Sequence, residues 1–107
     1  MQQVIDRTLY DTEQAEAIAQ YAPLIDSGDY NYLVETLYKT AAGDYFLHGD
    51  GGAATKWAEK QGGYRTANEE IELLTEDEAV DWCETRKIDG EIIVEEFGHL
   101  ISNPATE

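Results

Sequence analysis

The single cysteine and the two histidines are the residues of this 107-residue chain best suited to nucleophilic or acid–base chemistry. Cys83, His48 and His99 supply the groups of a thiol nucleophile and its base. Cys83, however, shares a predicted helix face with Ala79 and Trp82, which favours a buried structural thiol. Two histidines without i, i+4 spacing are also weak evidence for a metal site. We therefore expect no catalytic centre, no metal and no cofactor here.

The glycine-rich segment His48-Gly49-Asp50-Gly51-Gly52 is a second candidate for chemistry. Glycines let a backbone approach a ligand closely, and their N–H groups can hold an anion. No Lys followed by Ser or Thr comes after the segment, as it would in a phosphate-binding loop. Asp50 would also repel phosphate. The segment is better interpreted as a tight connection from a strand to a helix over residues 53–61.

Acidic residues dominate the chain, with 23 Asp and Glu against 7 Lys and Arg and a formal net charge of -16. Such a charge repels phosphate backbones and membranes of like sign, so we expect neither direct nucleic-acid binding nor membrane binding. Adjacent pairs such as Glu69-Glu70 and Glu95-Glu96 do not converge across a cleft, which excludes a glycosidase pair. A folded acidic domain can, however, bind the proteins that bind nucleic acid.

The acidity is concentrated toward the C-terminus. Residues 69–96 contain 12 acidic residues against Arg86 and Lys87, whereas residues 1–68 have a net charge of only -5. Solvated helix faces would explain this charge without any partner. Adaptation to high salt would instead spread the acidity over the whole surface.

The pattern of apolar residues predicts an α+β fold, with an antiparallel sheet of three to four strands packed with three or four short helices. The chain should form one domain over 1–107, with a flexible tail at 102–107. Thr75-Glu76-Asp77-Glu78 is a complete capping box and marks a helix start. Strands are predicted over residues 3–10, 30–40, 44–48 and 67–74. Helices are predicted over 12–21, 53–61, a segment that begins at 76, and 91–101. For the last of these, Ile92-Ile93-Val94 leaves a strand as the alternative.

Tyrosines gather on the clearest predicted strand. Tyr30, Tyr32 and Tyr38 share one of its faces, with Tyr45 and Tyr64 expected nearby, while Leu33, Glu35 and Leu37 share the other. The tyrosine face can be core packing, or a protein interface in which tyrosine contributes a large area at low entropy cost.

The remaining composition predicts a soluble cytoplasmic protein. Aromatic residues make up 10% of the chain, too many for a disordered acidic tail. One cysteine allows no internal disulfide, and no apolar run approaches the roughly 20 residues of a membrane span.

Four blocks of sequence together resemble a known family. They are Leu9-Tyr10-Asp11-Thr12-Glu13-Gln14-Ala15, Glu35-Thr36-Leu37-Tyr38-Lys39-Thr40, Asp44-Tyr45-Phe46-Leu47-His48-Gly49-Asp50-Gly51-Gly52 and Leu73-Leu74-Thr75-Glu76-Asp77-Glu78-Ala79. In this order they resemble small acidic, uncharacterised proteins of phages, prophages and mobile elements in Gram-positive bacteria. The resemblance implies no catalytic residues. It implies a context that includes anti-defence proteins, among them anti-CRISPR inhibitors, some of which mimic DNA.

We therefore predict a binding and inhibitory protein, not an enzyme, that blocks a basic nucleic-acid-binding protein, such as a CRISPR-Cas component, by DNA mimicry. An accessory or scaffold protein using the aromatic sheet face, as a homodimer, is the first alternative. A small enzyme of unknown substrate is the second. The predicted partner-binding residues are Glu76, Asp77, Glu78, Asp81, Glu84, Glu91, Glu95 and Glu96, together with Tyr30, Tyr32 and Tyr38.

Overall fold

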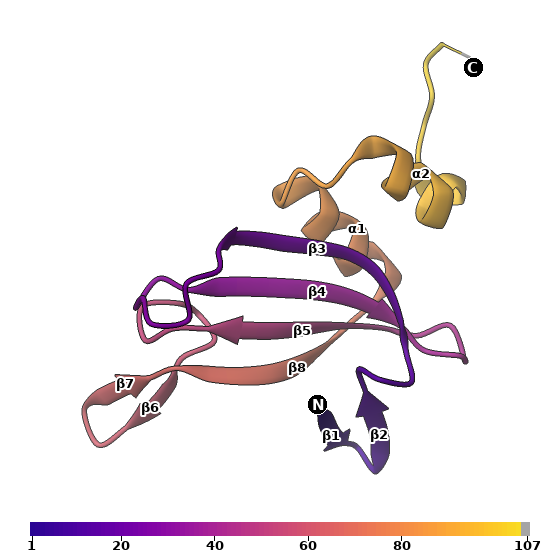
Figure 1. Ribbon diagram of the computed structural model, residues 1–107. Coiled ribbons are helices and arrows are strands. Elements are labelled where there is room, and N and C mark those ends of the chain that lie inside the picture. Colours follow the sequence, from indigo (N-terminus) through magenta and orange to yellow (C-terminus); the bar gives the residue numbers. More distant parts are fainter. Residues whose placement is uncertain (106–107) are drawn as a thin grey trace.

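A four-stranded antiparallel sheet forms the centre of the protein in the computed structural model, which describes residues 1–105 (Figure 1). Its strand order is β3-β4-β5-β8. The α+β class and the antiparallel sheet are therefore confirmed. The strands span β3 (Glu16–Leu24), β4 (Leu33–Lys39), β5 (Tyr45–Gly51) and β8 (Asn68–Leu74).

Alternation along β4 and β5 gives the sheet two different faces. Leu37, Leu47 and Tyr45 enter a core cluster with the helices. Phe46, between two of these residues in sequence, points to the opposite face and stacks on Tyr38 at a centroid distance of 5.2 Å. The strands predicted over 44–48 and 67–74 are confirmed. The strand predicted over 30–40 is confirmed only from Leu33, because residues 29–32 form a turn.

Two α-helices and a short 3-10 turn follow the sheet: α1 (Glu76–Thr85), α2 (Gly90–Phe97) and η1 (Gly98–Leu100). This is fewer than the three or four helices predicted. The predicted capping box is confirmed by two hydrogen bonds: Glu78 N donates to Thr75 Oγ1 at 3.1 Å, and Thr75 N donates to Glu78 Oε1 at 2.9 Å. Asp89 caps α2 by accepting from Glu91 N at 2.9 Å. The strand alternative for residues 92–94 is therefore wrong.

The first sequence segment is a hairpin, not the single strand predicted over 3–10. Its strands β1 (Gln2–Ile5) and β2 (Thr8–Asp11) are joined by Asp6 and Arg7, both with positive φ, of 50° and 63°. Two successive positive φ values are typical of the tightest hairpin turns. The hairpin packs on the sheet face opposite the helices, where the rings of Tyr10 and Phe46 meet edge to face at 5.7 Å.

The helix predicted over 12–21 is wrong, because residues 12–15 form a turn and residues 16–21 belong to β3. A register shift lies between Ala17 and Ala19. It allows the successive residues Ile18 and Ala19 both to face the helices, and this spacing imitates a helical stripe. Asp11, just before this segment, accepts from Glu13 N at 2.9 Å in a turn.

The helix predicted over 53–61 is also wrong. Residues 53–58 form turns, and the chain continues into a small hairpin of β6 (Glu59–Gln61) and β7 (Tyr64–Thr66). The Arg65 guanidinium donates to the carbonyls of Ala53 and Thr55, which takes up acceptors that a helix would use internally. Trp57 is buried even so, at 3% exposure.

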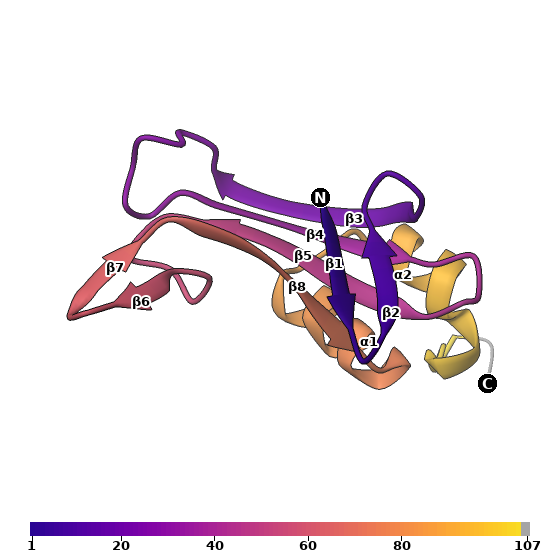
Figure 2. The same cartoon turned by 90° about the horizontal axis from the view of Figure 1, so that it is seen from below.

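The molecule is elongated, with principal extents of 54 × 31 × 21 Å. The β6–β7 hairpin projects at one end, α2 lies toward the other, and α1 lies over the middle of the sheet in both views (Figures 1 and 2). No helix among residues 1–105 has the length and apolar character to cross a membrane. Of the tail predicted over 102–107, residues 106 and 107 lie outside the described residues.

Candidate functional site

Helix α1 presents a stripe of carboxylates to solvent. Asp77, Asp81 and Glu84 follow i, i+4, i+7 spacing, which places them on one helix face, and all three are exposed. Within residues 1–105 their side chains form no ion pair and no hydrogen bond. Helical rise separates successive charges by about 4.5–6 Å along the axis. This is sparser than one DNA strand, which carries a phosphate every ~3.4 Å of axis.

Helix α2 adds two more unpaired carboxylates. Glu91 and Glu95 are one helical turn apart, exposed and without a side-chain partner in the described chain. We call the five side chains of the two helices the carboxylate surface. Its members are Asp77, Asp81, Glu84, Glu91 and Glu95.

Asp77 and Glu91 lie in the first turns of their helices, where negative charge favours the helix, but two other carboxylates of the set do not favour helix stability. The last turns of α1 and α2 contain no basic residue, yet Glu84 and Glu95 lie there. Carboxylates at a helix C-terminus oppose the macrodipole, at a cost of about 0.3–1 kcal/mol each. Helix stability therefore does not explain why acidic residues occupy these two positions.

Three of the predicted partner-binding glutamates have internal partners. Glu78 closes the capping box, and Glu76 lies 3.0 Å from His99 Nε2. Glu96 accepts from Lys39 Nζ at 2.8 Å and from the Tyr45 hydroxyl. Burial raises the pKa of Glu96, but these two hydrogen bonds outweigh it, so its pKa lies below the ordinary value. Glu78 and Glu96 thus have structural roles, and Asp77, Asp81, Glu84, Glu91 and Glu95 are the predicted residues with no such contact among the described residues.

A buried carboxylate that sequence reasoning did not single out anchors α1 to the sheet. Glu35 is only 1% exposed. Its Oε1 accepts from Trp82 Nε1 at 2.9 Å and Arg86 Nε at 2.8 Å, and its Oε2 accepts from Trp57 Nε1 at 2.8 Å. The available signal was its place on β4 between Leu33 and Leu37, on the face that turns toward the core.

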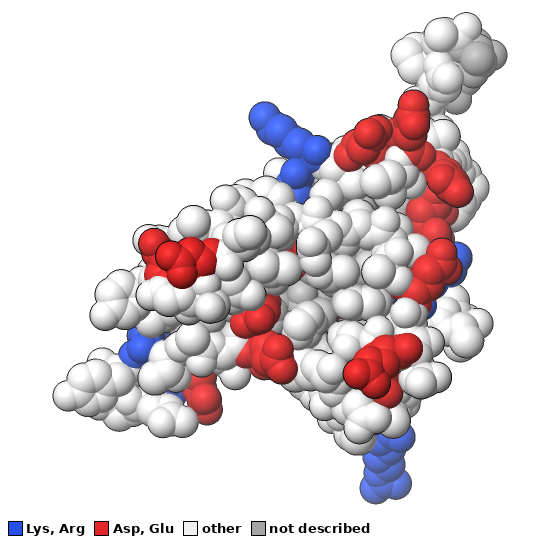
Figure 3. Space-filling view, viewed as in Figure 1, with Lys and Arg blue, Asp and Glu red and all other residues white. Residues whose placement is uncertain are grey.

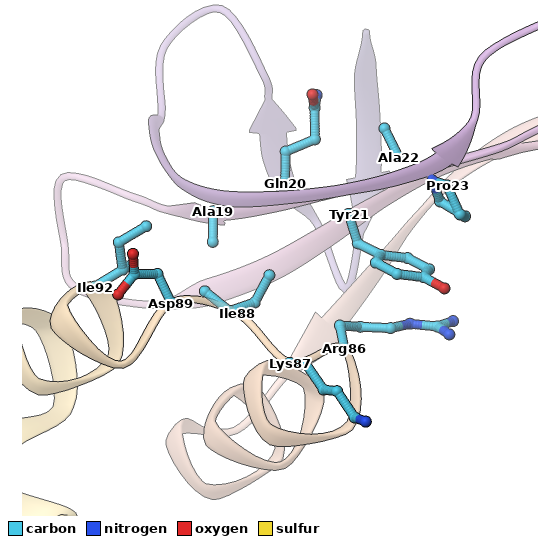
Figure 4. A pocket seen from close by; sticks show the side chains of 10 residues that line it. All are labelled: Ala19, Gln20, Tyr21, Ala22, Pro23, Arg86, Lys87, Ile88, Asp89 and Ile92. Atoms are coloured by element: carbon cyan, nitrogen blue, oxygen red, sulfur yellow. The ribbon is translucent and has the colours of Figure 1, made fainter.

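Both oxygens of this carboxylate are satisfied, so the cluster is structural. Burial raises the pKa of the Glu35 carboxyl, but three hydrogen bonds and the Arg86 charge outweigh burial and hold the pKa below its ordinary value. Arg86 in turn lies over the ring of Tyr21, 4.5 Å from its centroid, on the edge strand β3 (Figure 4). The cluster therefore ties the end of α1 to three parts of the sheet domain.

The predicted tyrosine face is not one open surface. Tyr30 precedes β4 and is 75% exposed, whereas Tyr32 donates to Asp50 Oδ2 at 3.1 Å. Tyr38 stacks on Phe46 below the hairpin. Tyr45 lies on the helix face, so it does not join the other tyrosines.

The residues suited to chemistry are not brought together as a reactive group. Cys83 is fully buried, and burial raises its pKa to about 11, which keeps the thiol protonated. The structural interpretation of this residue is confirmed. His48 Nε2 is buried and lies 3.3 Å from Glu69 Oε2, outside hydrogen-bond geometry. No group of three or more metal-ligating side chains occurs among the described residues.

The glycine-rich segment serves close packing. Gly49 and Gly51 belong to β5, so the predicted connection to a helix is wrong. A Cβ added at Gly49 would lie 1.9 Å from the Trp57 ring, and one at Gly52 would lie 2.4 Å from the Tyr30 carbonyl oxygen. These contacts account for glycine without a bound anion.

Acidic side chains are unevenly distributed on the face shown in Figure 3. One group lies over α2 and continues down the adjacent edge of the molecule, and smaller groups are separated from it by uncharged surface. The carboxylates thus do not form a single continuous row on this face.

Comparisons with known proteins add no relative from which a role could be transferred. Protein-family models, curated proteins and solved structures were all compared with this chain, and none of them matches it.

Proposed function

We propose that this protein is an acidic inhibitor that occupies the basic nucleic-acid-binding surface of a partner protein through the carboxylate surface of α1 and α2. The partner class that the sequence resemblance suggests is a bacterial defence effector, such as a CRISPR-Cas component. The observation that supports this proposal most is the set of five exposed carboxylates on the two helices that have no partner among the residues the structure describes.

Electrostatics would give such a protein a fast and salt-sensitive interaction. Complementary charge steers two proteins together and chiefly accelerates association. Because the Debye length falls from about 10 Å at 0.1 M salt to about 3 Å at 1 M, the attraction should weaken steeply as salt rises. The spacing of the α1 carboxylates is too wide to copy DNA charge for charge. The mimicry that we propose lies in the overall negative potential and the shape of the carboxylate surface, which would occupy a basic groove of the partner.

The test begins with affinity capture from a bacterial lysate at about 0.1 M salt, followed by identification and purification of the captured protein. The purified partner is then loaded with a labelled DNA, and displacement by the wild-type protein is followed by fluorescence anisotropy. Displacement at 0.1 M salt that is lost near 0.5 M supports the proposal. A partner that keeps its DNA in the presence of excess inhibitor contradicts it.

The tyrosines do not favour the accessory role to the same degree. Tyr38 and Tyr32 already have internal partners, so an aromatic interface would depend on Tyr30 and Tyr64, of which Tyr64 is 77% exposed on β7. A partner retained through the high-salt wash would point to these two side chains.

A further inference from the structure

The carboxylate surface borders a groove between the edge strand β3 and the segment that joins α1 to α2. The groove has a volume of about 460 Å³ (Figure 4). Its middle is apolar, because Ala19 on β3 faces Ile88 across the groove. Tyr21 and Arg86 mark one end of the groove, and Ile92 and Asp89 mark the other.

A second hollow of about 140 Å³ continues the groove beyond Ile92. It is lined by Ile92, by the start of β3 and by α2. Two of its carboxylates, Glu16 and Glu95, have no ion pair within residues 1–105, and Glu95 belongs to the carboxylate surface. The whole groove is thus acidic at the Glu16 end and apolar in its middle.

Ile92 lies where the two hollows meet and is 37% exposed. Its neighbour Ile93 packs on the core, so α2 is apolar on more than its buried face. Exposed apolar surface rimmed by polar groups is typical of interaction sites. An apolar centre with a polar rim is also the usual arrangement of protein interfaces.

The edge of β3 is unsuited to regular pairing with another strand. Register shifts interrupt it between Ala17 and Ala19 and between Tyr21 and Leu24, and Pro23 lacks an N–H group. An occupant of the groove should therefore be held by its side chains and not by a backbone ladder.

We propose that this groove binds a basic segment of the partner that carries an apolar side chain beside its Lys or Arg residues. The apolar side chain enters between Ala19, Ile88 and Ile92, and the cation pairs with Glu16 and Glu95. This inference rests on the proposed function, since it names the segment that the acidic end of the molecule recognises. Arg86 and Lys87 at the far end repel a cation, which fixes the direction of the bound segment.

Two synthetic 12-residue peptides of equal charge test this proposal, one alternating lysine with leucine and the other alternating lysine with serine. Binding to the full chain is measured by fluorescence anisotropy at 0.1 M salt, and the contacted residues are mapped by amide chemical shifts. We expect the leucine peptide to bind at least tenfold more tightly and to shift the amide signals of Ala19, Ile88 and Ile92. Ile92→Ser should abolish the tenfold difference, whereas Val94→Ser, a control on the same helix outside the groove, should preserve it.

Several outcomes separate the groove from the proposed function. Equal affinity for both peptides overturns the proposal that the groove is a binding site, but it does not contradict the proposed role of the carboxylate surface. Failure of both peptides to bind counts against both proposals. If the groove signals shift with protein concentration alone, a second copy of this chain is the occupant and the proposal is wrong. The shift mapping uses the wild-type protein, so it decides the question even if Ile92→Ser does not fold.

Discussion

Substitution of Glu35 by glutamine tests the claim that a buried carboxylate fastens α1 to the sheet. The carboxylate accepts three hydrogen bonds, on both of its oxygens. Glutamine offers one acceptor oxygen and one NH₂ group, so at least one of the N–H donors of Trp57, Trp82 or Arg86 would face the NH₂ group, which is itself a donor. Removing one member of a buried ion pair costs about 3–5 kcal/mol. Because the Arg86 side chain is 26% exposed and keeps part of its hydration, we expect about 3 kcal/mol.

The assay is urea unfolding followed by far-UV circular dichroism, since fluorescence would report the changed surroundings of Trp57 and Trp82. Glu72→Gln is the matched control, because Glu72 pairs with Lys56 at 3.2 Å in an exposed ion pair. Exposed pairs contribute about 0–1 kcal/mol, so this variant should unfold close to the wild type. If Glu35→Gln loses no more stability than Glu72→Gln, the anchoring role of Glu35 is refuted.

The stability difference between wild type and Glu35→Gln should also depend on pH. The folded pKa of Glu35 lies below its ordinary value of 4.5, so its contribution to stability is complete above that value and is lost as pH falls through the folded pKa. The difference in unfolding free energy between wild type and Glu35→Gln should therefore be constant near neutral pH and shrink below about pH 4.5. A difference that stays constant down to pH 3 contradicts the depressed pKa.

Three further substitutions or treatments have defined outcomes. Gly49→Ala places a Cβ 1.9 Å from the Trp57 ring and should destabilise the fold by about 1–3 kcal/mol. The control Gly43→Ala has open space around its Cβ, so it should lose only the roughly 1 kcal/mol that a strained positive φ costs. Thermal unfolding of the two variants provides the comparison. Lys87 has φ 54° after the end of α1, where glycine is favoured, so Lys87→Gly should raise stability by about 0.5–1 kcal/mol in urea titrations, and a loss would contradict the strain. Cys83 should react with iodoacetamide at pH 8 only as fast as the protein opens, and a rate equal to that in urea would show the thiol to be accessible.

The sequence was most informative where local signals and tertiary packing agree. The capping box at Thr75 predicted α1, and the helix predicted over 91–101 is observed as α2, Gly90–Phe97, followed by a 3-10 turn. The central strands follow from the alternation of apolar and polar residues in β4, β5 and β8. In each case the residues that form the element also supply the face that packs.

Predictions failed where tertiary contacts override local spacing. The bulge in β3 puts Ile18 and Ala19 on one side of the sheet, which no local rule distinguishes from a helix. Residues 53–58 depend on the distant side chain of Arg65 to satisfy their carbonyls. The hairpin turn at Asp6 and Arg7 was not predicted, because it lacks the glycine or asparagine that is typical of such a turn.

The charge of the proposed acidic site was predictable from the sequence, but the residues that belong to it were not. The sequence identifies every carboxylate of residues 76–96, yet only the fold distinguishes Glu78 and Glu96, which are bonded internally, from Asp81 and Glu84, which have no side-chain partner within residues 1–105. The Glu35 cluster could not be predicted, because its donors come from positions 22, 47 and 51 residues away.

Charge reversal on α1 tests the central claim most directly. The variant Asp81→Lys/Glu84→Lys is compared with Glu59→Lys/Glu70→Lys, which changes the net charge equally at exposed positions outside the two helices. The measurement is displacement of labelled DNA from the captured partner at 0.1 M salt. Our account predicts at least a tenfold loss for the α1 variant, equivalent to about 1.4 kcal/mol, and a smaller loss for the control. Equal losses in the two folded variants would show that only net charge matters and would contradict a binding surface on α1.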